Sequence, residues 1–292
     1  MIRIHISELS RKLFLLCPEQ DKRPLMAWSQ SADLNCLGNQ HFSKGFYTEA
    51  FQCYAQALEV DRKNGDQRAL ATTLGNLGNI CAVSGRRNQA RAYYTEVLEL
   101  QKILGDDRGI STTLANLGNL SADAGEWERA QAYYLEALDL MNGLADYAGK
   151  AVLLSDLGLV ARETGRENEA LAYYQESLIL MRRVGNQAGQ SDVFRMMGRL
   201  YLRQRRYEEA QSCTLTSLDV ARRLKDELRM GGAWYVLASC SEALGEWSQA
   251  IQYLQKVVRI DQKYQLPKLT ENIQRLQALK TRLSAATGKP NE

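Results

Sequence analysis

Proline is scarce in this sequence. Pro18, Pro24, Pro267 and Pro290 are the four that occur in 292 residues, and none lies between positions 25 and 266. Because a proline in a helix interior costs about 3 kcal/mol, this long stretch is compatible with a succession of helices. No apolar run reaches the roughly 18 residues that a membrane-spanning helix needs. The sequence therefore predicts a helical chain without membrane spans.

Residues typical of catalysis and metal binding are also few. The two histidines, His5 and His41, lie far apart, and none of the six cysteines forms a Cys-x-x-Cys pair. The sequence has no His-Glu-x-x-His, P-loop, Gly-x-Gly-x-x-Gly or Gly-x-Ser-x-Gly motif. We therefore expect no enzymatic activity, no cofactor and no metal site. The absence of a secretory signal and the scattered cysteines predict a cytoplasmic protein with reduced thiols.

Charge of one sign is not in large excess. The 37 Lys and Arg residues nearly balance the 34 Asp and Glu residues, for a net charge of +3. This balance argues against nucleic acid or an anionic membrane as the main partner. The apolar share of 45% is that of a globular protein rather than a disordered one.

What the sequence does contain is a repeat of forty residues. Alanine recurs at that spacing, and three further apolar columns keep the same period. The columns are Ala50, Ala90, Ala130, Ala170, Ala210 and Ala250; Leu58, Leu98, Leu138, Leu178, Leu218 and Val258; Val60, Leu100, Leu140, Leu180, Val220 and Ile260; and Leu37-Gly38, Leu77-Gly78, Leu117-Gly118, Leu157-Gly158, Met197-Gly198 and Leu237-Ala238. Six units therefore run without insertion: 31–70, 71–110, 111–150, 151–190, 191–230 and 231–270.

Each unit reads as two helices joined by a turn. In the third unit Leu114, Leu117 and Ser121 share one helical face, Gly125 marks the turn, and Tyr134 lies on the apolar face of the second helix. The unit boundaries carry residues suited to helix ends. Glycine fits the left-handed C-terminal position at Gly105 and Gly185, and the expected N-caps are Asp66, Asp106, Asp146, Asn186 and Asp226.

The order Leu-x-x-Leu-Gly, Gly-x-Trp/Tyr-x-x-Ala and Tyr-x-x-Ala resembles the tetratricopeptide repeat, in its variety of about forty residues. The resemblance covers 31–270 and implies an all-α fold, a right-handed superhelical solenoid of six helix-turn-helix repeats. Such repeats occur in peptide-binding adaptors and in bacterial regulators. Thr214 and Leu254 depart from the pattern where Tyr or Phe is usual, and Arg205 replaces the turn glycine.

The two ends of the array need caps, because one repeat alone cannot bury its apolar faces. An amphipathic C-terminal capping helix is expected over 267–286, after Pro267 and with Leu269, Ile273 and Leu276 on its apolar stripe. Residues 1–30 are expected to form an N-terminal extension with a short capping helix, and 287–292 a frayed tail.

The first helix of each unit has one face opposite its core stripe. The resemblance implies that this face lines the concave groove. This face is rich in asparagine in the first three units and in arginine in the next two. The candidate peptide-binding residues are Asn35, Asn39, Asn76, Asn79, Asn116, Asn119, Arg162, Arg195, Arg199 and Arg203. Asparagine offers donors and an acceptor to an extended backbone, and arginine binds carboxylates bidentately.

Both features have a second interpretation. The asparagines can belong to the repeat for reasons of folding, and Arg195 and Arg199 can pair internally with Asp156, Asp192 or Glu163. On the binding interpretation, replacing Arg195, Arg199 and Arg203 by Glu abolishes binding without unfolding the chain.

The sequence thus predicts a non-enzymatic scaffold or adaptor that binds an extended or partly helical segment of another protein, with acidic residues facing the fourth and fifth units. The alternative is a regulator that responds to a signalling peptide by a change in the shape of its superhelix. We expect no nucleic-acid or membrane partner, while weak self-association through imperfect caps stays open.

Overall fold

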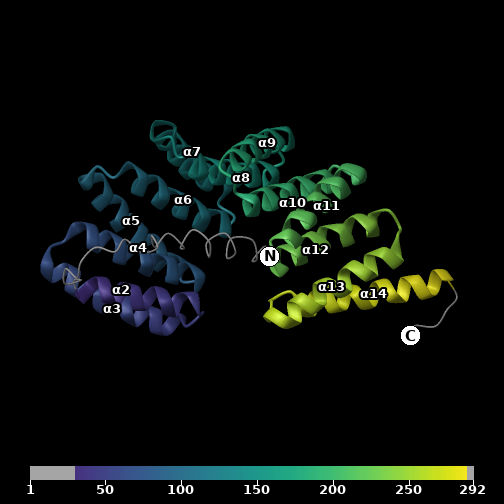
Figure 1. Ribbon diagram of the computed structural model, residues 1–292, viewed down its shortest axis with the longest axis horizontal. Coiled ribbons are helices and arrows are strands. Elements are labelled where there is room, and N and C mark those ends of the chain that lie inside the picture. Colours follow the sequence, from purple (N-terminus) through teal and green to yellow (C-terminus); the bar gives the residue numbers. More distant parts are fainter. Residues whose placement is uncertain (1–29, 288–292) are drawn as a thin grey trace. The chain divides into compact units, whose positions relative to one another are not determined.

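The computed structural model describes residues 30–287, which form thirteen α-helices and no strand (Figure 1). The chain divides after Ala145 into two units of stacked antiparallel helices. The first contains α2 (Gln30–Ser43), α3 (Tyr47–Asn64), α4 (Gln67–Val83), α5 (Arg87–Leu104), α6 (Asp107–Asp123) and α7 (Trp127–Leu144). The second contains α8 (Tyr147–Glu163), α9 (Glu167–Arg183), α10 (Gln187–Arg203), α11 (Tyr207–Arg223), α12 (Glu227–Ala243), α13 (Trp247–Tyr264) and α14 (Leu269–Thr287).

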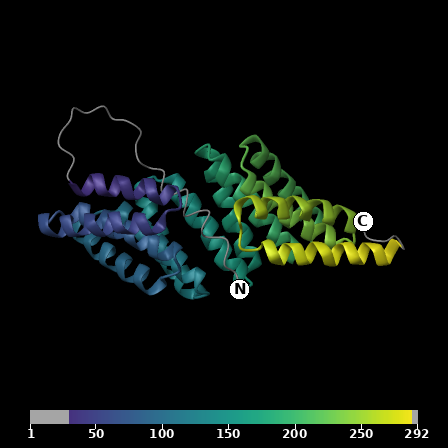
Figure 2. The same cartoon turned by 90° about the horizontal axis from the view of Figure 1, so that it is seen from below.

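Six helix pairs, from α2–α3 to α12–α13, keep the forty-residue period and are called repeats 1 to 6, each with a helix A followed by a helix B. The predicted all-α repeat fold is confirmed. A helix occupies the segment predicted for the C-terminal cap, and α14 packs along α13 (Figure 2). The predicted N-terminal extension, apart from Gln30, and the tail after Thr287 lie outside the described residues.

Helix ends form as the sequence predicts. The five boundary residues Asp66, Asp106, Asp146, Asn186 and Asp226 each accept a hydrogen bond from a backbone N–H in the first turn of the following helix A. Gly105 and Gly185 end their helices with φ of 63° and 68°. Arg205, which replaces the turn glycine of repeat 5, takes the same left-handed conformation with φ 59°.

Helices A and B of repeats 1 to 4 meet through a glycine and a tyrosine. A Cβ added at Gly78 would lie 2.6 Å from Cε1 of Tyr94, and one added at Gly118 would lie 2.5 Å from the same atom of Tyr134. The ring therefore lies directly on the glycine, and Tyr134 is 1% exposed. In repeat 5 the short Thr214 occupies the place of the tyrosine, and its hydroxyl bonds to the Ala210 carbonyl of its own helix at 2.6 Å.

Neighbouring helices A contact each other within each unit: α2 contacts α4, and α10 contacts both α8 and α12. Residues on the exposed side of these helices consequently lie near residues of the next repeat. This arrangement brings together the candidate residues of each unit.

Candidate functional site

The asparagines at the ninth position of repeats 1 to 3 are bonded to the core tyrosine of their own repeat. The hydroxyls of Tyr54, Tyr94 and Tyr134 donate to the Oδ1 atoms of Asn39, Asn79 and Asn119, each at 2.6 Å. This bond uses the acceptor of each amide. The amide NH2 groups have no acceptor among the described residues, and these asparagines are partly exposed. What they offer to a ligand is hydrogen-bond donors.

Asn35 and Asn76 belong to an internal network between repeats 1 and 2. Asn76 donates to Asn35 at 3.0 Å, and Asn35 donates to Thr73 at 2.7 Å. Thr73 in turn donates to the buried carboxylate of Asp61 at 2.6 Å. These contacts fit the folding interpretation of the two asparagines.

Asn116, on α6, differs from the other five. It is partly exposed and makes no hydrogen bond with any residue that the structure describes. Both its donors and its acceptor are open to a ligand.

Repeat 4 breaks the tyrosine–asparagine pattern. Leu159 stands where repeats 1 to 3 have asparagine, so the hydroxyl of Tyr174 has no hydrogen-bond partner among residues 30–287, although Tyr174 is 0% exposed. Burial raises the pKa of this phenol to about 12. A buried polar group without a partner costs free energy. Repeat 4 therefore departs from the tyrosine–asparagine pair of repeats 1 to 3 at a cost in stability.

Arg162, on α8, is 8% exposed and lies in the same part of unit 2. Its Nε and Nη2 atoms donate to Glu163 at 3.1 and 2.6 Å, while its Nη1 atom is buried and has no partner in the described part of the chain. Arg203, on α10, is exposed. It bonds to the carbonyl of Arg162 at 2.7 Å and pairs with Glu167 at 3.3 Å.

Arg195 is 5% exposed and takes part in a buried ionic network. It pairs with Asp192 at 3.4 Å, and Arg229 of α12 donates to the same carboxylate at 2.6 Å while also pairing with Asp226. The side chain of Arg195 lies along Gly232, whose added Cβ would approach its Cδ to 3.1 Å. Internal pairing, one of the two interpretations left open by the sequence, therefore describes Arg195. Replacing it by Glu would set two buried carboxylates together, so the triple Glu variant is a poor test of binding.

Arg229 was not among the residues predicted from the sequence, although the sequence contains a signal for it. Its column holds Ala69, Gly109, Gly149 and Gly189 in the preceding repeats, so an arginine there is conspicuous once the columns are aligned.

Arg199 makes no hydrogen bond or ion pair with any described residue. It stands one repeat after Leu159, in the column of the asparagines, and Thr214 supplies no tyrosine hydroxyl to it. Burial, together with the positive charges of Arg195 and Arg162, lowers the pKa of its guanidinium to about 9. The pKa falls because no anion among the described residues compensates the buried guanidinium.

Asp156, on α8, is 7% exposed, and burial raises the pKa of its carboxyl to about 7. No hydrogen bond or ion pair within 30–287 compensates it. The structure thus brings Asp156, Arg162, Tyr174, Arg195 and Arg199 into one neighbourhood of unit 2, which we call the α8–α10 cluster.

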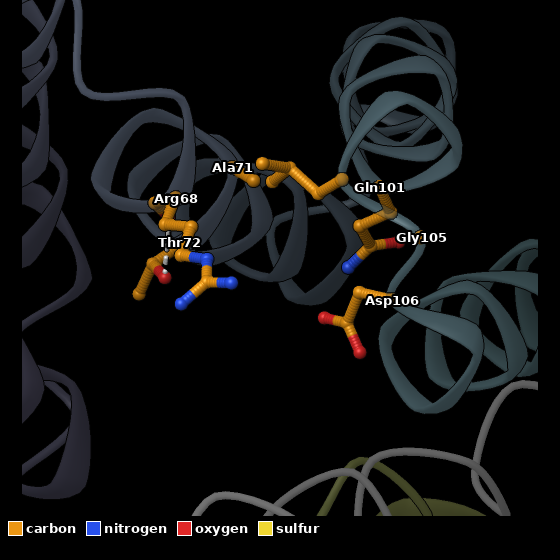
Figure 3. Close-up of a pocket in the computed structure, with 7 residues that line it drawn as sticks. Arg68, Ala71, Thr72, Gln101, Gly105 and Asp106 are labelled. Carbon is orange, nitrogen blue, oxygen red and sulfur yellow. Dashed lines mark hydrogen bonds between the residues drawn. The ribbon is translucent and has the colours of Figure 1, made fainter.

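A pocket of about 520 Å³ lies in unit 1, and its lining contains none of the predicted residues (Figure 3). Arg68 and Thr72 of α4 line one side, and Gln101 of α5 and Asp106 line the other. Figure 3 shows the side chains of Arg68 and Asp106 pointing toward the same space. Asp106 caps α6 through the N–H of Gly109 at 2.9 Å, so this part of the lining is engaged in folding.

Within residues 30–287 no group of three or more His, Cys, Asp or Glu side chains is placed to hold a metal ion. The same part of the chain contains no helix that is long and apolar enough to cross a membrane.

The family follows from a comparison with protein-family models. The model of the tetratricopeptide repeat matches residues 28–103, 109–183 and 190–263, each stretch covering two helix pairs. The chain belongs to the tetratricopeptide repeat family. A comparison with curated proteins found no match.

Solved tetratricopeptide structures share the fold at low sequence identity. A Rap protein in complex with competence and sporulation factor is 15% identical, with a TM-score of 0.65 over 89% of this chain and 78% of that one. The apo quorum sensor NprR from B. thuringiensis is 16% identical, with a TM-score of 0.69 over 86% and 70% of the two chains. PilF from Pseudomonas aeruginosa is 19% identical, with a TM-score of 0.57 over 85% and 97%. At these identities the likeness shows the fold.

Proposed function

We propose that this protein is a non-enzymatic scaffold that binds an extended or partly helical peptide segment of another protein along its A helices. The observation that carries the proposal is unused hydrogen-bonding capacity on those helices. Among residues 30–287, Asn116 has no hydrogen-bond partner, the amide NH2 groups of Asn39, Asn79 and Asn119 have no acceptor, and Arg199 has no ion-pair partner.

The spacing of these groups suits an extended backbone. Asn79 and Asn119 occupy equivalent positions of successive A helices, and the tyrosine bond orients both amides alike. Repeated donors of this kind bind main-chain carbonyls whatever the side chains of the ligand. The arginines of unit 2 add a preference for acidic residues, because guanidinium groups pair with carboxylates.

Selection of twelve-residue peptides from a randomised display library on the full chain tests this proposal. We expect enrichment of peptides with an acidic residue, and a weaker affinity of those peptides for Asn116→Ala and Arg199→Gln. The matched control is Arg223→Gln on α11, where an exposed arginine pairs with Asp219 at 3.2 Å. Equal helicity by circular dichroism is required of all variants. No enrichment, or affinities that none of the A-helix variants changes, would contradict the proposal.

A second candidate is a regulator whose shape responds to a signalling peptide. The observation that favours it is the likeness to the Rap protein complexed with competence and sporulation factor and to the quorum sensor NprR. Small-angle scattering with and without a selected peptide separates the two candidates. A change in the radius of gyration supports the regulator, and an unchanged radius supports the scaffold.

A further inference from the structure

Three hydrogen-bond donors of the α8–α10 cluster lack an acceptor within the part of the chain that the structure describes. They are the hydroxyl of Tyr174, the Nη1 atom of Arg162 and the guanidinium of Arg199. Tyr174 and Arg162 are 0% and 8% exposed, so water does not readily satisfy them. Because all three groups are donors that need an acceptor and lie in the same cluster, one shared acceptor can satisfy them.

The repeat register explains how these donors come to be unpaired. In repeats 1 to 3 the ninth residue of helix A is an asparagine that accepts from the tyrosine of its own repeat. Repeat 4 keeps Tyr174 but replaces the acceptor with Leu159, and repeat 5 places Arg199 at the acceptor position but replaces the tyrosine with Thr214. Two successive departures thus remove the internal acceptors from adjoining helices.

Counted over the described residues only, the ion pairs in and around the cluster leave one positive charge in excess. Arg162 is paired with Glu163, Arg203 with Glu167, and Arg195 and Arg229 share Asp192 and Asp226. Arg199 is left over. The buried carboxyl of Asp156 makes no ion pair with it, and this carboxyl is largely neutral below a pH of about 7.

We propose that the α8–α10 cluster binds a single carboxylate of the partner segment, which accepts hydrogen bonds from Tyr174, Arg162 and Arg199. This inference rests on the proposed function and specifies which chemical group of the ligand enters unit 2. A planar monoanion suits the one surplus charge and the fork of donors on a guanidinium. Arg199 and Leu159 are partly exposed, so the cluster is in contact with solvent at these two side chains.

The first test uses small anions on the full chain. Sodium acetate, sodium phosphate and sodium chloride are titrated at pH 6 and matched ionic strength, with the unfolding temperature and isothermal calorimetry as readouts. We expect acetate to bind and to raise the unfolding temperature more than chloride does. Acetate that acts no differently from chloride overturns the proposal, and a clear preference for phosphate overturns the assignment to a carboxylate.

Three variants locate the bound acetate. Arg199→Gln should weaken acetate binding at least tenfold, and Tyr174→Phe by about threefold to tenfold. Leu159→Asn restores the acceptor present in repeats 1 to 3, so it should weaken acetate binding as Tyr174→Phe does while the chain stays as stable as before. The control Arg223→Gln should bind acetate like the wild type. Unchanged acetate affinity in Leu159→Asn and Arg199→Gln would overturn the proposal even if Tyr174→Phe failed to fold.

Two capped peptides identify the source of the carboxylate. Binding of Ac-Gly-Gly-Glu-Gly-Gly-NH2 supports an acidic side chain, and binding of Ac-Gly-Gly-Gly-Gly-Gly-OH supports a chain terminus. The display selection is independent of this test. If the display library yields binding peptides but the protein does not bind acetate, the carboxylate site is refuted and the scaffold is not. If the protein binds acetate but no peptide is selected, the scaffold is refuted and the anion site is not.

Discussion

At the scale of single residues, the same residue type has different roles in different repeats. Tyr94 and Tyr174 pack on the same kind of glycine, yet the first donates to Asn79 and the second has no partner. Sequence columns identify both as core residues. They do not separate a satisfied hydroxyl from an unsatisfied one, because the acceptor lies on the other helix of the pair.

This difference predicts opposite effects of one substitution. Tyr94→Phe removes a hydrogen bond and should lower the free energy of unfolding by about 1 kcal/mol, whereas Tyr174→Phe removes an unsatisfied buried hydroxyl and should leave it unchanged or raise it by up to about 1 kcal/mol. Urea denaturation of the two variants and the wild type measures this. Equal losses in both variants would show that the hydroxyl of Tyr174 is satisfied in solution.

Asp156 predicts how stability depends on pH. Its pKa is about 7 in the folded chain against an ordinary 3.8, so the folded chain binds the proton more tightly than the unfolded chain. Proton binding by Asp156 therefore contributes roughly 4 kcal/mol to the free energy of unfolding below pH 3.8. This contribution is lost as the pH rises through about 7.

The variant Asp156→Asn stays neutral and should not show this loss. We expect it to be more stable than the wild type by up to roughly 4 kcal/mol at pH 8 and about equal to it at pH 4. Urea denaturation across that range gives both curves. A constant difference between the two curves would exclude a titrating Asp156.

At the scale of elements, close approach of helices A and B depends on the glycine of the Leu-Gly column. Helix α4 contains two glycines, of which one lies at the contact with helix B and the other does not. Comparing them separates the effect of helix packing from that of helix propensity. Gly78 lies under the ring of Tyr94, while a Cβ added at Gly75 would meet nothing within 4 Å.

Alanine at these two positions should therefore act in opposite directions. Gly78→Ala forces the ring away and should cost about 1–3 kcal/mol, whereas Gly75→Ala should stabilise the chain by about 0.5–1 kcal/mol through the lower entropy of its unfolded state. Thermal and urea unfolding of both variants provide the comparison. Two losses of similar size would mean that helix packing at Gly78 is not the cause.

At the scale of the whole molecule, the division after Ala145 gives each unit three helix pairs. In repeat proteins stability is approximately a sum over repeats and the interfaces between neighbours. Three stacked pairs bury a core that continues from one repeat to the next, such as the cluster of Cys81, Ala90, Tyr94, Leu117 and Leu120 in the first unit.

Fragments 1–145 and 146–292 should therefore each fold when expressed separately. We expect each to show a helical circular dichroism spectrum and a cooperative unfolding transition, and we expect acetate to stabilise 146–292 but not 1–145. A fragment without helical signal would show that three pairs are too few in this chain. A response to acetate in 1–145 would locate the anion site outside the α8–α10 cluster.

The sequence by itself determined the forty-residue period, the helix pairs, their N-caps and the apolar faces on which the tyrosines lie. These features depend on neighbours along one helix or across one helix pair, and the six copies repeat the same evidence. The six asparagines and four arginines were also placed on their helices from the sequence, and their role in binding stays a prediction.

Only the tertiary structure decided which of those polar groups are used internally. Asn35 and Asn76 bond across two repeats, Arg195 shares Asp192 with Arg229, which is 34 residues further along the chain, and Arg199 is left without an anion. Whether a polar atom is satisfied depends on the exact position of a partner on another helix, to within a few tenths of an ångström. A pattern of residue types along the chain does not contain that position.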